Sequence, residues 1–341
     1  MIFLRPIKET DLEAFIALNK LSSIGMTSLP KDARLLEKKL YLSLDSFKKN
    51  VTNPENEFYL FALEDSQEHT IIGNSAIFAT TGGGESLYFF QKETLHSPST
   101  LDDVTKSLSL LTPISYIRGP SEICSLFLHP EKRKHGLGKL LSLARFHFIA
   151  AFPERFTNSV FTELRGVIEN DKCLFWDGVG RHFFNVSFSK VIDLLKYGKS
   201  FITHFLPKYP IYTTFLPKEV QDVIGKTHSK TRAALVMLLQ EGFEMTDEID
   251  IFDGGPKLRA LKNNIRTIYE SKVFQIAAIQ DDIEQNNFLL SNEKINFRAC
   301  IGSMVIKDET SAIITSETSE SLQVGLGDSI RSSPIHEGEG K

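Results

Sequence analysis

The sequence is poor in cysteine and lacks any long apolar run. Its three cysteines, Cys124, Cys173 and Cys300, are odd in number, and none belongs to a Cys-x-x-Cys pair. This usage is typical of reduced thiols and argues against a disulfide framework. No apolar run approaches the ~20 residues that a membrane-spanning helix needs, and the opening Met-Ile-Phe-Leu-Arg-Pro lacks the pattern of a signal peptide. We therefore expect a cytoplasmic protein with no membrane partner.

A surplus of positive charge is also missing. The chain has 39 Lys and Arg against 43 Asp and Glu, which gives a net charge of −4. Because no basic domain stands out, nucleic acid is not expected as a partner. The histidines are scattered, and His129 and His135 have no partners at ligand spacing, so we expect no metal site.

The chain does have an ordinary globular composition, 41% hydrophobic and 24% charged over 341 residues. This length suggests two domains, or one large domain with an appendage. We predict a main domain at 1–256, a small β-rich appendage at 257–331, and a disordered tail rich in Ser, Gly and Glu at 332–341.

Hydrophobic periodicity predicts helices and strands in an α+β order, because two helices precede a meander of strands. Helices are expected at 12–21, 31–48, 137–152 and 171–178, with a further helix that could span 258–268. Strands are expected at 2–7, 58–63, 70–80, 87–91, 122–128, 161–167 and 181–188, and the appendage should hold strands at 296–303, 304–307, 312–315 and 322–324. Residues 92–120 should form a long loop or an edge hairpin.

A helix–Gly–strand pattern occurs twice, first at 174–184 and again near 232–252. In both segments an apolar helix should end near a Gly, which supplies a left-handed cap, before a strand led by Phe. We read this as a partial internal duplication, with chance as an equal rival.

A glycine-containing loop between a predicted strand and helix is the most informative segment. It contains Arg133-Lys134-His135-Gly136-Leu137-Gly138. The two glycines let the backbone approach a ligand closely, and the helix that starts near Leu137 offers unpaired N–H groups to an anion. The spacing fits neither a P-loop nor a dinucleotide fingerprint, and a solvated turn is the rival interpretation. The pyrophosphate of coenzyme A is the anion that such a loop suits.

The order of elements around this loop resembles the GCN5-related N-acetyltransferase superfamily. Leu4-Arg5-Pro6-Ile7 followed by Asp11-Leu12-Glu13 is similar to the superfamily's first strand and helix, and Phe175-Trp176 through Phe183-Phe184 is similar to a later motif. The resemblance implies the acyl-CoA N-acyltransferase fold, a mixed and mainly antiparallel sheet flanked by helices, for the main domain.

Further motifs narrow the resemblance to the arginine N-succinyltransferase family. They extend to about residue 256, and beyond it the match is looser. They comprise 26–30, 121–130, Glu163-Leu164-Arg165-Gly166-Val167-Ile168, 207–212, Gln221-Asp222-Val223-Ile224-Gly225 with His228, and Ile249-Asp250-Ile251-Phe252-Asp253-Gly254-Gly255-Pro256.

The resemblance implies that His228 donates a proton and that Leu126 contacts succinyl-CoA. Ser229 stands where the family commonly has Pro, and His129 stands where it often has an acidic residue. The resemblance also implies direct transfer without an acyl-enzyme. A backbone N–H of the strand around Leu126 to Leu128 would then meet the oxyanion.

An arginine acceptor needs a carboxylate for its guanidinium and a cation for its carboxyl group. Two pairs are candidates, Glu163 with Arg165 and Asp250 with Asp253, although each could equally be structural. Asp253 in particular reads as an ordinary turn residue. Arg165 and Arg181 are guesses for the carboxylate of the succinyl group.

The resemblance thus implies an arginine N-succinyltransferase of arginine catabolism, which moves succinyl from succinyl-CoA to the α-amine of L-arginine, or of ornithine. Succinyl-CoA would be a co-substrate, and no permanently bound cofactor is expected. An acetyl-CoA-dependent N-acetyltransferase and a non-catalytic acyl-CoA-binding subunit remain alternatives. A homo-oligomer is compatible with the sequence, which does not decide it.

Overall fold

The computed structural model describes residues 1–22, 25–82, 84–97, 106–133, 136–284 and 286–335. Within these ranges one sheet of 16 strands runs through the molecule, in the order β10-β5-β4-β11-β12-β7-β6-β3-β2-β1-β15-β14-β18-β13-β17-β16. All but two of its neighbouring pairs are antiparallel. The parallel pairs are β6–β7 and β13–β17. The expected mixed, mainly antiparallel sheet is therefore confirmed.

The strands of the half that holds the site are β1 (Ile2–Pro6), β2 (Phe58–Asp65), β3 (Thr70–Phe78), β4 (Leu87–Ser97), β5 (Lys106–Tyr116), β6 (Ser121–Leu128), β7 (Ser159–Glu163), β10 (Ile211–Tyr212), β11 (Glu244–Asp250) and β12 (Pro256–Leu261). The other half contains β13 (Lys272–Ile279), β14 (Phe288–Asn292), β15 (Ala299–Gly302), β16 (Met304–Ile306), β17 (Ser311–Ile314) and β18 (Ser329–Pro334). A separate two-stranded ribbon pairs β8 (Ile168–Glu169) with β9 (Lys172–Cys173).

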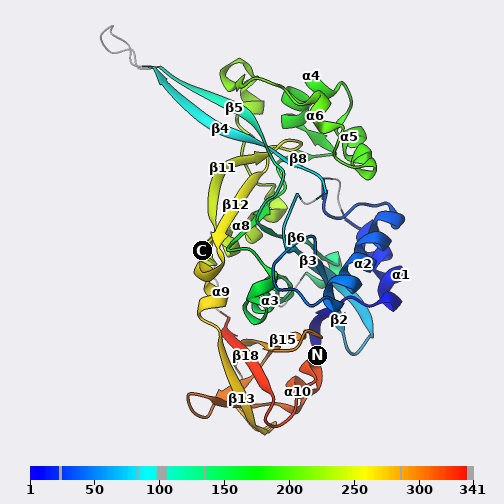
Figure 1. The fold of residues 1–341 in the computed structure, drawn as a ribbon, viewed down its shortest axis with the longest axis vertical. Coiled ribbons are helices and arrows are strands. Elements are labelled where there is room, and N and C mark those ends of the chain that lie inside the picture. Colours follow the sequence, from blue (N-terminus) through cyan, green and yellow to red (C-terminus); the bar gives the residue numbers. More distant parts are fainter. Residues whose placement is uncertain (23–24, 83, 98–105, 134–135, 285, 336–341) are drawn as a thin grey trace.

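The helices are α1 (Leu12–Lys20), α2 (Ala33–Lys48), α3 (Leu137–Ala151), α4 (Arg181–Phe184), α5 (Phe188–Leu194), α6 (Ile202–Phe205), α7 (Lys218–Gln221), α8 (Arg232–Gln240), α9 (Arg266–Tyr269) and α10 (Ser316–Leu322). In Figure 1, α4 to α6 lie at one end of the molecule, and α10 lies at the other end with β13 and β18.

Helices α1 and α2 cover one face of the central strands, and α3 covers the other. Alternation along a strand explains this, since successive side chains point to opposite faces. In β2, Phe58 and Leu60 pack with Leu36 and Leu40 of α2. Tyr59 and Phe61 instead belong to the cluster around α3. Each face of the sheet therefore has its own apolar core.

Capping residues fix where these helices begin. The Asp32 carboxylate accepts hydrogen bonds from the amides of Arg34 (2.9 Å) and Leu35 (3.4 Å) at the start of α2. Gly136 precedes α3 with φ of 76°, a left-handed conformation that favours glycine.

The hairpin of β4 and β5 projects from the body (Figure 1). Of the two alternatives for 92–120, the edge hairpin is therefore confirmed, although 98–105 lies outside the described residues.

The strand predicted at 181–188 is wrong. Residues 181–184 form α4, which ends at Asn185 in a left-handed conformation (φ 52°), and Ser187 then caps α5 by accepting from the Lys190 amide at 3.3 Å. The apolar side chains of this segment pack around Trp176 rather than onto a sheet. The segment 174–184 therefore lacks the strand that the duplication required, whereas 232–252 does contain helix α8 and strand β11.

The helix predicted over 258–268 is also wrong in its first half. Residues 256–261 form β12, which pairs with β7 and β11, and only 266–269 are α-helical. The domain boundary predicted at 256/257 thus falls at the first residues of a strand of the main sheet. A strand predicted at 322–324 is replaced by the end of α10, and residues 332–334 of the predicted tail belong to β18.

Among the described residues, none of the helices combines the length and the hydropathy needed to cross a membrane.

Candidate active site

Strands β6 and β7 begin as a parallel pair and then separate. Their register holds only at Ser121↔Val160 and Glu122↔Phe161. Beyond Glu122, the edge of β6 that faces β7 lies outside any strand ladder. On its other side β6 pairs with β3, where the register jumps from Asn74↔Phe127 to Ala76↔Cys124. Such an irregularity bends a strand and re-aims its backbone, and Ser125 within it has φ of 52°. We call the opening between the two strands the β6–β7 splay.

The loop after α1 bridges the two arms of this splay. On the β6 arm, the Ser125 amide donates to Ser28 Oγ and Ser125 Oγ donates to the Ser28 carbonyl, both at 3.2 Å. On the β7 arm, Gly25 lies so close that an added Cβ would be 2.7 Å from Ile168 Cδ1 and 3.3 Å from Arg165 Nε. Residues 25–30 therefore form one wall across the mouth of the splay.

The predicted acyl-CoA residues lie along β6 and at the start of α3. Leu126 and Leu128 pack into the core cluster on the α3 face. The Arg133 Nε donates to the Leu128 carbonyl at 3.2 Å, so this side chain folds back onto β6. Lys134 and His135 lie outside the described residues.

The first turn of α3 leaves room and donors for a ligand. Among the described residues, backbone bonding of α3 begins where the Lys139 and Leu140 amides donate to the Gly136 carbonyl, and the amides of Leu137 and Gly138 precede that bond. A Cβ added at Gly136 or Gly138 would meet nothing within 4 Å.

His228 lies on the opposite arm, beside the segment that follows β7. Its backbone amide donates to the Arg165 carbonyl at 2.8 Å, and its Nδ1 accepts from the Lys230 amide at 3.0 Å. Because Nδ1 accepts, the neutral ring carries its proton on Nε2. Burial, reinforced by the Arg165 charge, lowers the pKa of His228. The ring is therefore neutral at physiological pH, but it is 8% exposed and does not line the cavity described below.

Asp253 has a structural position. Its carboxylate accepts from the Gly166 amide at 2.9 Å and the Gly255 amide at 2.8 Å, and so ties the turn after β11 to the end of β7. Burial and the nearby Asp250 raise the pKa of Asp253 to about 8. Arg165 lies in the same junction, between Gly25 and His228. Neither Arg165 nor Asp253 lines the cavity described below, whereas Glu163, the predicted partner of Arg165, does.

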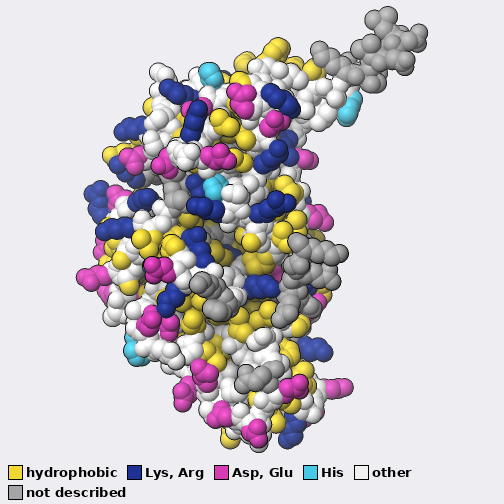
Figure 2. Space-filling view, turned by 180° about the vertical axis from the view of Figure 1, so that it is seen from behind, with side chains coloured by type: hydrophobic (Ala, Val, Ile, Leu, Met, Phe, Trp, Pro, Cys, Tyr) yellow, Lys and Arg dark blue, Asp and Glu magenta, His cyan; other side chains and the backbone are white. Residues whose placement is uncertain are grey.

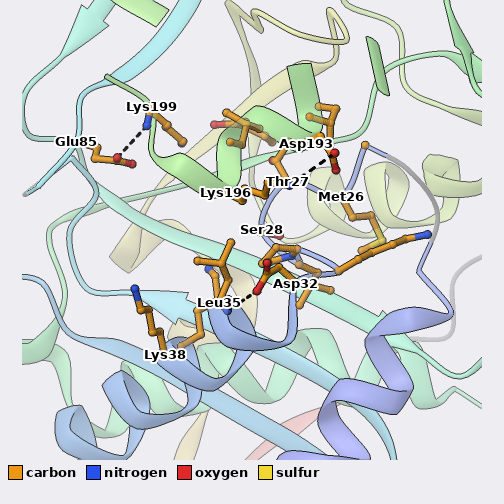
Figure 3. A pocket seen from close by; sticks show the side chains of 18 of the residues that line it. Met26, Thr27, Ser28, Asp32, Leu35, Lys38, Glu85, Asp193, Lys196 and Lys199 are labelled. Atoms are coloured by element: carbon orange, nitrogen blue, oxygen red, sulfur yellow. Dashed lines mark hydrogen bonds and ion pairs between the residues drawn. The ribbon is translucent and has the colours of Figure 1, made fainter. Parts of the chain in front are cut away.

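A cavity of about 1300 Å³ opens on the face of the sheet covered by α2. In Figure 3 the 26–28 loop lies between the start of α2 and the end of α5. Asp32, Leu35 and Lys38 mark the α2 side, and Asp193 and Lys196 mark the α5 side. Glu85, from the β3–β4 turn, accepts from the Lys199 backbone amide at 2.8 Å across the cavity. In Figure 2 the middle of the molecule is hollowed, and Lys and Arg side chains gather around the hollow.

Carboxylates line the inner wall of this cavity. Glu122 lies in the paired start of β6, and Glu163 is the last residue of β7, two positions past its last pair with β6. Asp250 joins Glu163 in a smaller adjoining pocket. Burial raises the pKa of all three, and Asp250 and Glu122 raise that of Glu163 further. Within the described ranges, neither Glu122 nor Glu163 accepts a hydrogen bond or forms an ion pair, whereas Asp250 accepts from the amides of Phe252 and Asp253. We call Glu122, Glu163 and Asp250 the acidic wall.

Sequence reasoning missed Glu122 and the two lysines nearest to it, Lys39 and Lys199. Glu122 is a charged residue in an otherwise apolar strand, which is a usable signal. Lys39 follows the buried Leu36 by three residues and precedes the buried Ser43 by four, so the helical period places it on the inward face. Lys199 gave no signal, because it lies in an irregular connection between α5 and α6.

No group of three or more His, Cys, Asp or Glu side chains suited to a metal ion occurs in the described part of the chain.

These features define a class of protein. A parallel strand pair that separates at a bulge, helices on both faces, and a helix opened by glycine beside the splay are those of an acyl-CoA N-acyltransferase with the GCN5-related fold. The chain is an enzyme of the acyltransferase class.

The comparisons identify the particular family. The family model described as "Arginine N-succinyltransferase beta subunit" matches residues 2–267, and that of its C-terminal domain matches 272–334. Curated arginine N-succinyltransferases of Yersinia pestis (strain Pestoides F) and Escherichia coli (strain 55989 / EAEC) are 37% and 35% identical, each over 97% of both chains. The solved arginine/ornithine succinyltransferase subunit AI of Pseudomonas aeruginosa is 31% identical, with a TM-score of 0.89 over 99% of both chains. The chain belongs to the arginine N-succinyltransferase family.

Proposed function

We propose that this enzyme transfers a succinyl group from succinyl-CoA to the α-amino group of L-arginine, with L-ornithine as a second acceptor. The names of its relatives support these substrates. One observation carries the proposal for the site itself. The β6–β7 splay, which suits an acyl-CoA, adjoins a cavity whose acidic wall holds two carboxylates without a protein hydrogen-bond partner.

The acyl-CoA lies along β6 and reaches the start of α3. The backbone edge of β6 beyond Glu122 is open to it, next to Leu126 and Leu128. The amides of Leu137 and Gly138, in the first turn of α3, meet the pyrophosphate, which the helix dipole also favours. Leu126 lies where the register with β3 is interrupted, so its N–H is our candidate for the oxyanion donor.

The acceptor enters from the opposite face of the sheet. Its guanidinium binds Glu163, with Asp250 beside it, because a planar guanidinium matches carboxylates with charge-assisted hydrogen bonds. Asp253 and Arg165 hold the turn and the strand end that carry these side chains.

The reaction needs one proton to move from nitrogen to sulfur. The neutral amine attacks the thioester carbon, the C–S bond breaks, and the coenzyme A sulfur takes a proton. His228 is neutral, so its ring first accepts the proton that the amine loses and becomes an imidazolium. The imidazolium then gives a proton to the sulfur, which returns the ring to its neutral form. No nucleophilic Cys is required, and burial raises the pKa of the Cys124 thiol near the splay to about 12.

A thiol-release assay tests the function. Purified protein is given succinyl-CoA or acetyl-CoA together with L-arginine, L-ornithine or L-lysine. We expect release with succinyl-CoA and arginine or ornithine. Release only with acetyl-CoA would change the donor, and binding of coenzyme A without release from any pair would favour a non-catalytic role.

A further inference from the structure

Lys39 occupies an unusual position on the cavity wall. It lies on the inward face of α2, and its ammonium is 4.8 Å from the ring centroid of Phe58 and 5.1 Å from that of Phe78. Two aromatic faces hold a cation in place without neutralising its charge. Lys39 lines the cavity and forms no ion pair within 4 Å with any residue that the structure describes, although the Glu122 carboxylate acts on its charge from farther away.

This charge faces the strand that leads into the splay. The Lys39 ammonium lies over the ring of Phe78, and Phe78 pairs with Glu122 of β6, so the charge lies close to Glu122 and to the neighbouring Cys124. Cys124 directly precedes the irregularity at Ser125, beyond which the thioester of a bound acyl-CoA would lie. A short chain that extends from the thioester into the cavity would therefore pass Lys39.

Among the cations that line the cavity, Lys39 and Lys199 are the two whose charges act on Glu122 of β6. Lys199 lies beside the acidic wall, and its charge lowers the pKa of Glu122, Glu163 and Asp250. Its backbone amide donates to the Glu85 carboxylate. Arg181, a guess from the sequence, is 61% exposed at its side chain, lies 3.6 Å from Asp177 and is absent from the cavity wall. Arg165 lies in the junction behind Gly25 rather than on that wall.

We propose that Lys39 binds the free carboxylate of the succinyl group and so selects succinyl-CoA over acetyl-CoA. This inference rests on the proposed function, because it assumes a donor whose acyl chain ends in a carboxylate. Acetyl lacks that carboxylate and would leave the Lys39 ammonium desolvated without an anion. Binding of succinyl-CoA would give this partly buried ammonium a carboxylate within ion-pair distance, which no described residue supplies.

The test compares Lys39→Met with the wild type in calorimetric titrations of succinyl-CoA and of free coenzyme A. Loss of one charge-assisted contact should weaken succinyl-CoA binding by about 10- to 100-fold. Binding of free coenzyme A should be unchanged, because it has no succinyl carboxylate. Lys39→Arg should retain most of the affinity. Lys48→Met removes the same charge from the exposed end of α2 and should match the wild type.

Equal weakening of succinyl-CoA and free coenzyme A in Lys39→Met would overturn the assignment, as would a raised KM for arginine alone with unchanged succinyl-CoA binding. Lys39→Gln, which keeps a polar end, replaces Lys39→Met if that variant does not fold. Failure of the proposed function is distinguishable, because the wild type would then release no thiol from succinyl-CoA, whereas the titrations would still report on Lys39.

Discussion

At the scale of single residues, the acidic wall is the costliest feature of the site. Glu163 lies near both Glu122 and Asp250, and burial with these like charges raises its pKa well above the usual value. Buried carboxylates without partners destabilise a fold. Such a cost is typical of positions held for binding, because a cationic ligand supplies the missing partner.

Replacing Glu163 with Gln should therefore separate function from stability. We expect the KM for L-arginine to rise about 10- to 100-fold, since a charge-assisted pair to the guanidinium is lost. Stability of the ligand-free protein should stay equal or rise, because a buried charge disappears. Initial rates and thermal unfolding measure the two effects, with the exposed Glu244→Gln as control. A stability loss with an unchanged KM for arginine would make Glu163 structural.

The protonation of Glu163 adds a pH dependence. A raised pKa means that the carboxylate gains its charge only at a higher pH than an ordinary Glu. The KM for arginine should therefore fall as pH rises through the titration of the wall, and this slope should diminish in Glu163→Gln. If the KM for arginine depended on pH in the same way in the wild type and in Glu163→Gln, Glu163 would not be the titrating group.

His228 belongs to the chemical step rather than to binding. His228→Gln should lower kcat by about 10²- to 10⁴-fold, the usual worth of a general acid or base, with the affinity for acyl-CoA largely kept. Because the pKa of His228 is lowered, the acidic limb of kcat/KM that it causes should lie below about 6.5 and vanish in the variant. Turnover that survives with its pH profile intact would remove His228 from the mechanism.

At the scale of elements, the site depends on how β6 and α3 are joined. The loop between them begins where Arg133 returns to the Leu128 carbonyl, and α3 starts after the left-handed Gly136. The glycines leave open space beside the first amide groups of α3, and we expect the pyrophosphate there.

Gly138→Ala probes this space without harming the helix. Alanine favours a helix over glycine by up to about 1 kcal/mol, and a Cβ at Gly138 meets no protein atom within 4 Å. We therefore expect equal or higher thermal stability together with weaker binding of coenzyme A. Gly325→Ala, where a Cβ also meets nothing, should leave binding unchanged. Wild-type affinity in Gly138→Ala would move the pyrophosphate away from this helix.

The elements that carry local signals could be predicted from the sequence. The strand ending at Leu128 and the helix from Leu137 were clear, because a buried apolar run is followed by glycine and then by helical periodicity. The prediction of a strand at 181–188 was wrong. Phe183, Phe184 and Val186 suggest a strand, but Asn185 and Ser187 act as helix caps.

Sites that form between distant segments gave weaker signals. Glu122, Glu163 and Asp250 meet only because β6 and β7 pair and β11 lies beyond them in the sheet. The residue pattern within one strand shows neither that β6 pairs with β7 nor where the two strands separate. Glu163 and Asp250 were predicted in separate pairs, with Arg165 and with Asp253, and neither of those two partners lines the cavity, although Asp253 does contact Asp250.

At the scale of the whole molecule, the C-terminal half of the sheet is tied to the helix that opens the site. His147 of α3 is fully buried, and its two ring nitrogens lie 3.0 Å from Ser291 Oγ in β14 and 2.9 Å from Ser333 Oγ in β18. Burial, with a contribution from Arg331, lowers the pKa of His147 to about 3. The His147 ring is therefore neutral in the folded protein.

This linkage predicts a loss of stability in acid. Below pH about 6.5 the unfolded chain gains a proton at this His that the folded protein does not, so stability falls as pH falls from about 6.5 towards 3. The contribution approaches about 1.4 kcal/mol per pH unit. Denaturant unfolding at pH 7 and pH 5 should differ more in the wild type than in His147→Gln, by roughly 2 kcal/mol. Equal differences would mean that His147 is not held neutral.

The solved relative from Pseudomonas aeruginosa is described as a subunit, and a homo-oligomer of the present chain remains a prediction for light scattering.

The central claim is that the acyl group passes through the β6–β7 splay to an α-amine whose guanidinium lies against the acidic wall. The most direct test is the position of the new amide in the product formed from succinyl-CoA and L-arginine, read by tandem mass spectrometry and proton NMR. The account predicts a single product with succinyl on the α-nitrogen and a free guanidinium. A product acylated on the guanidino group would reverse the proposed orientation of the acceptor, and no product with either arginine or ornithine would contradict the account as a whole.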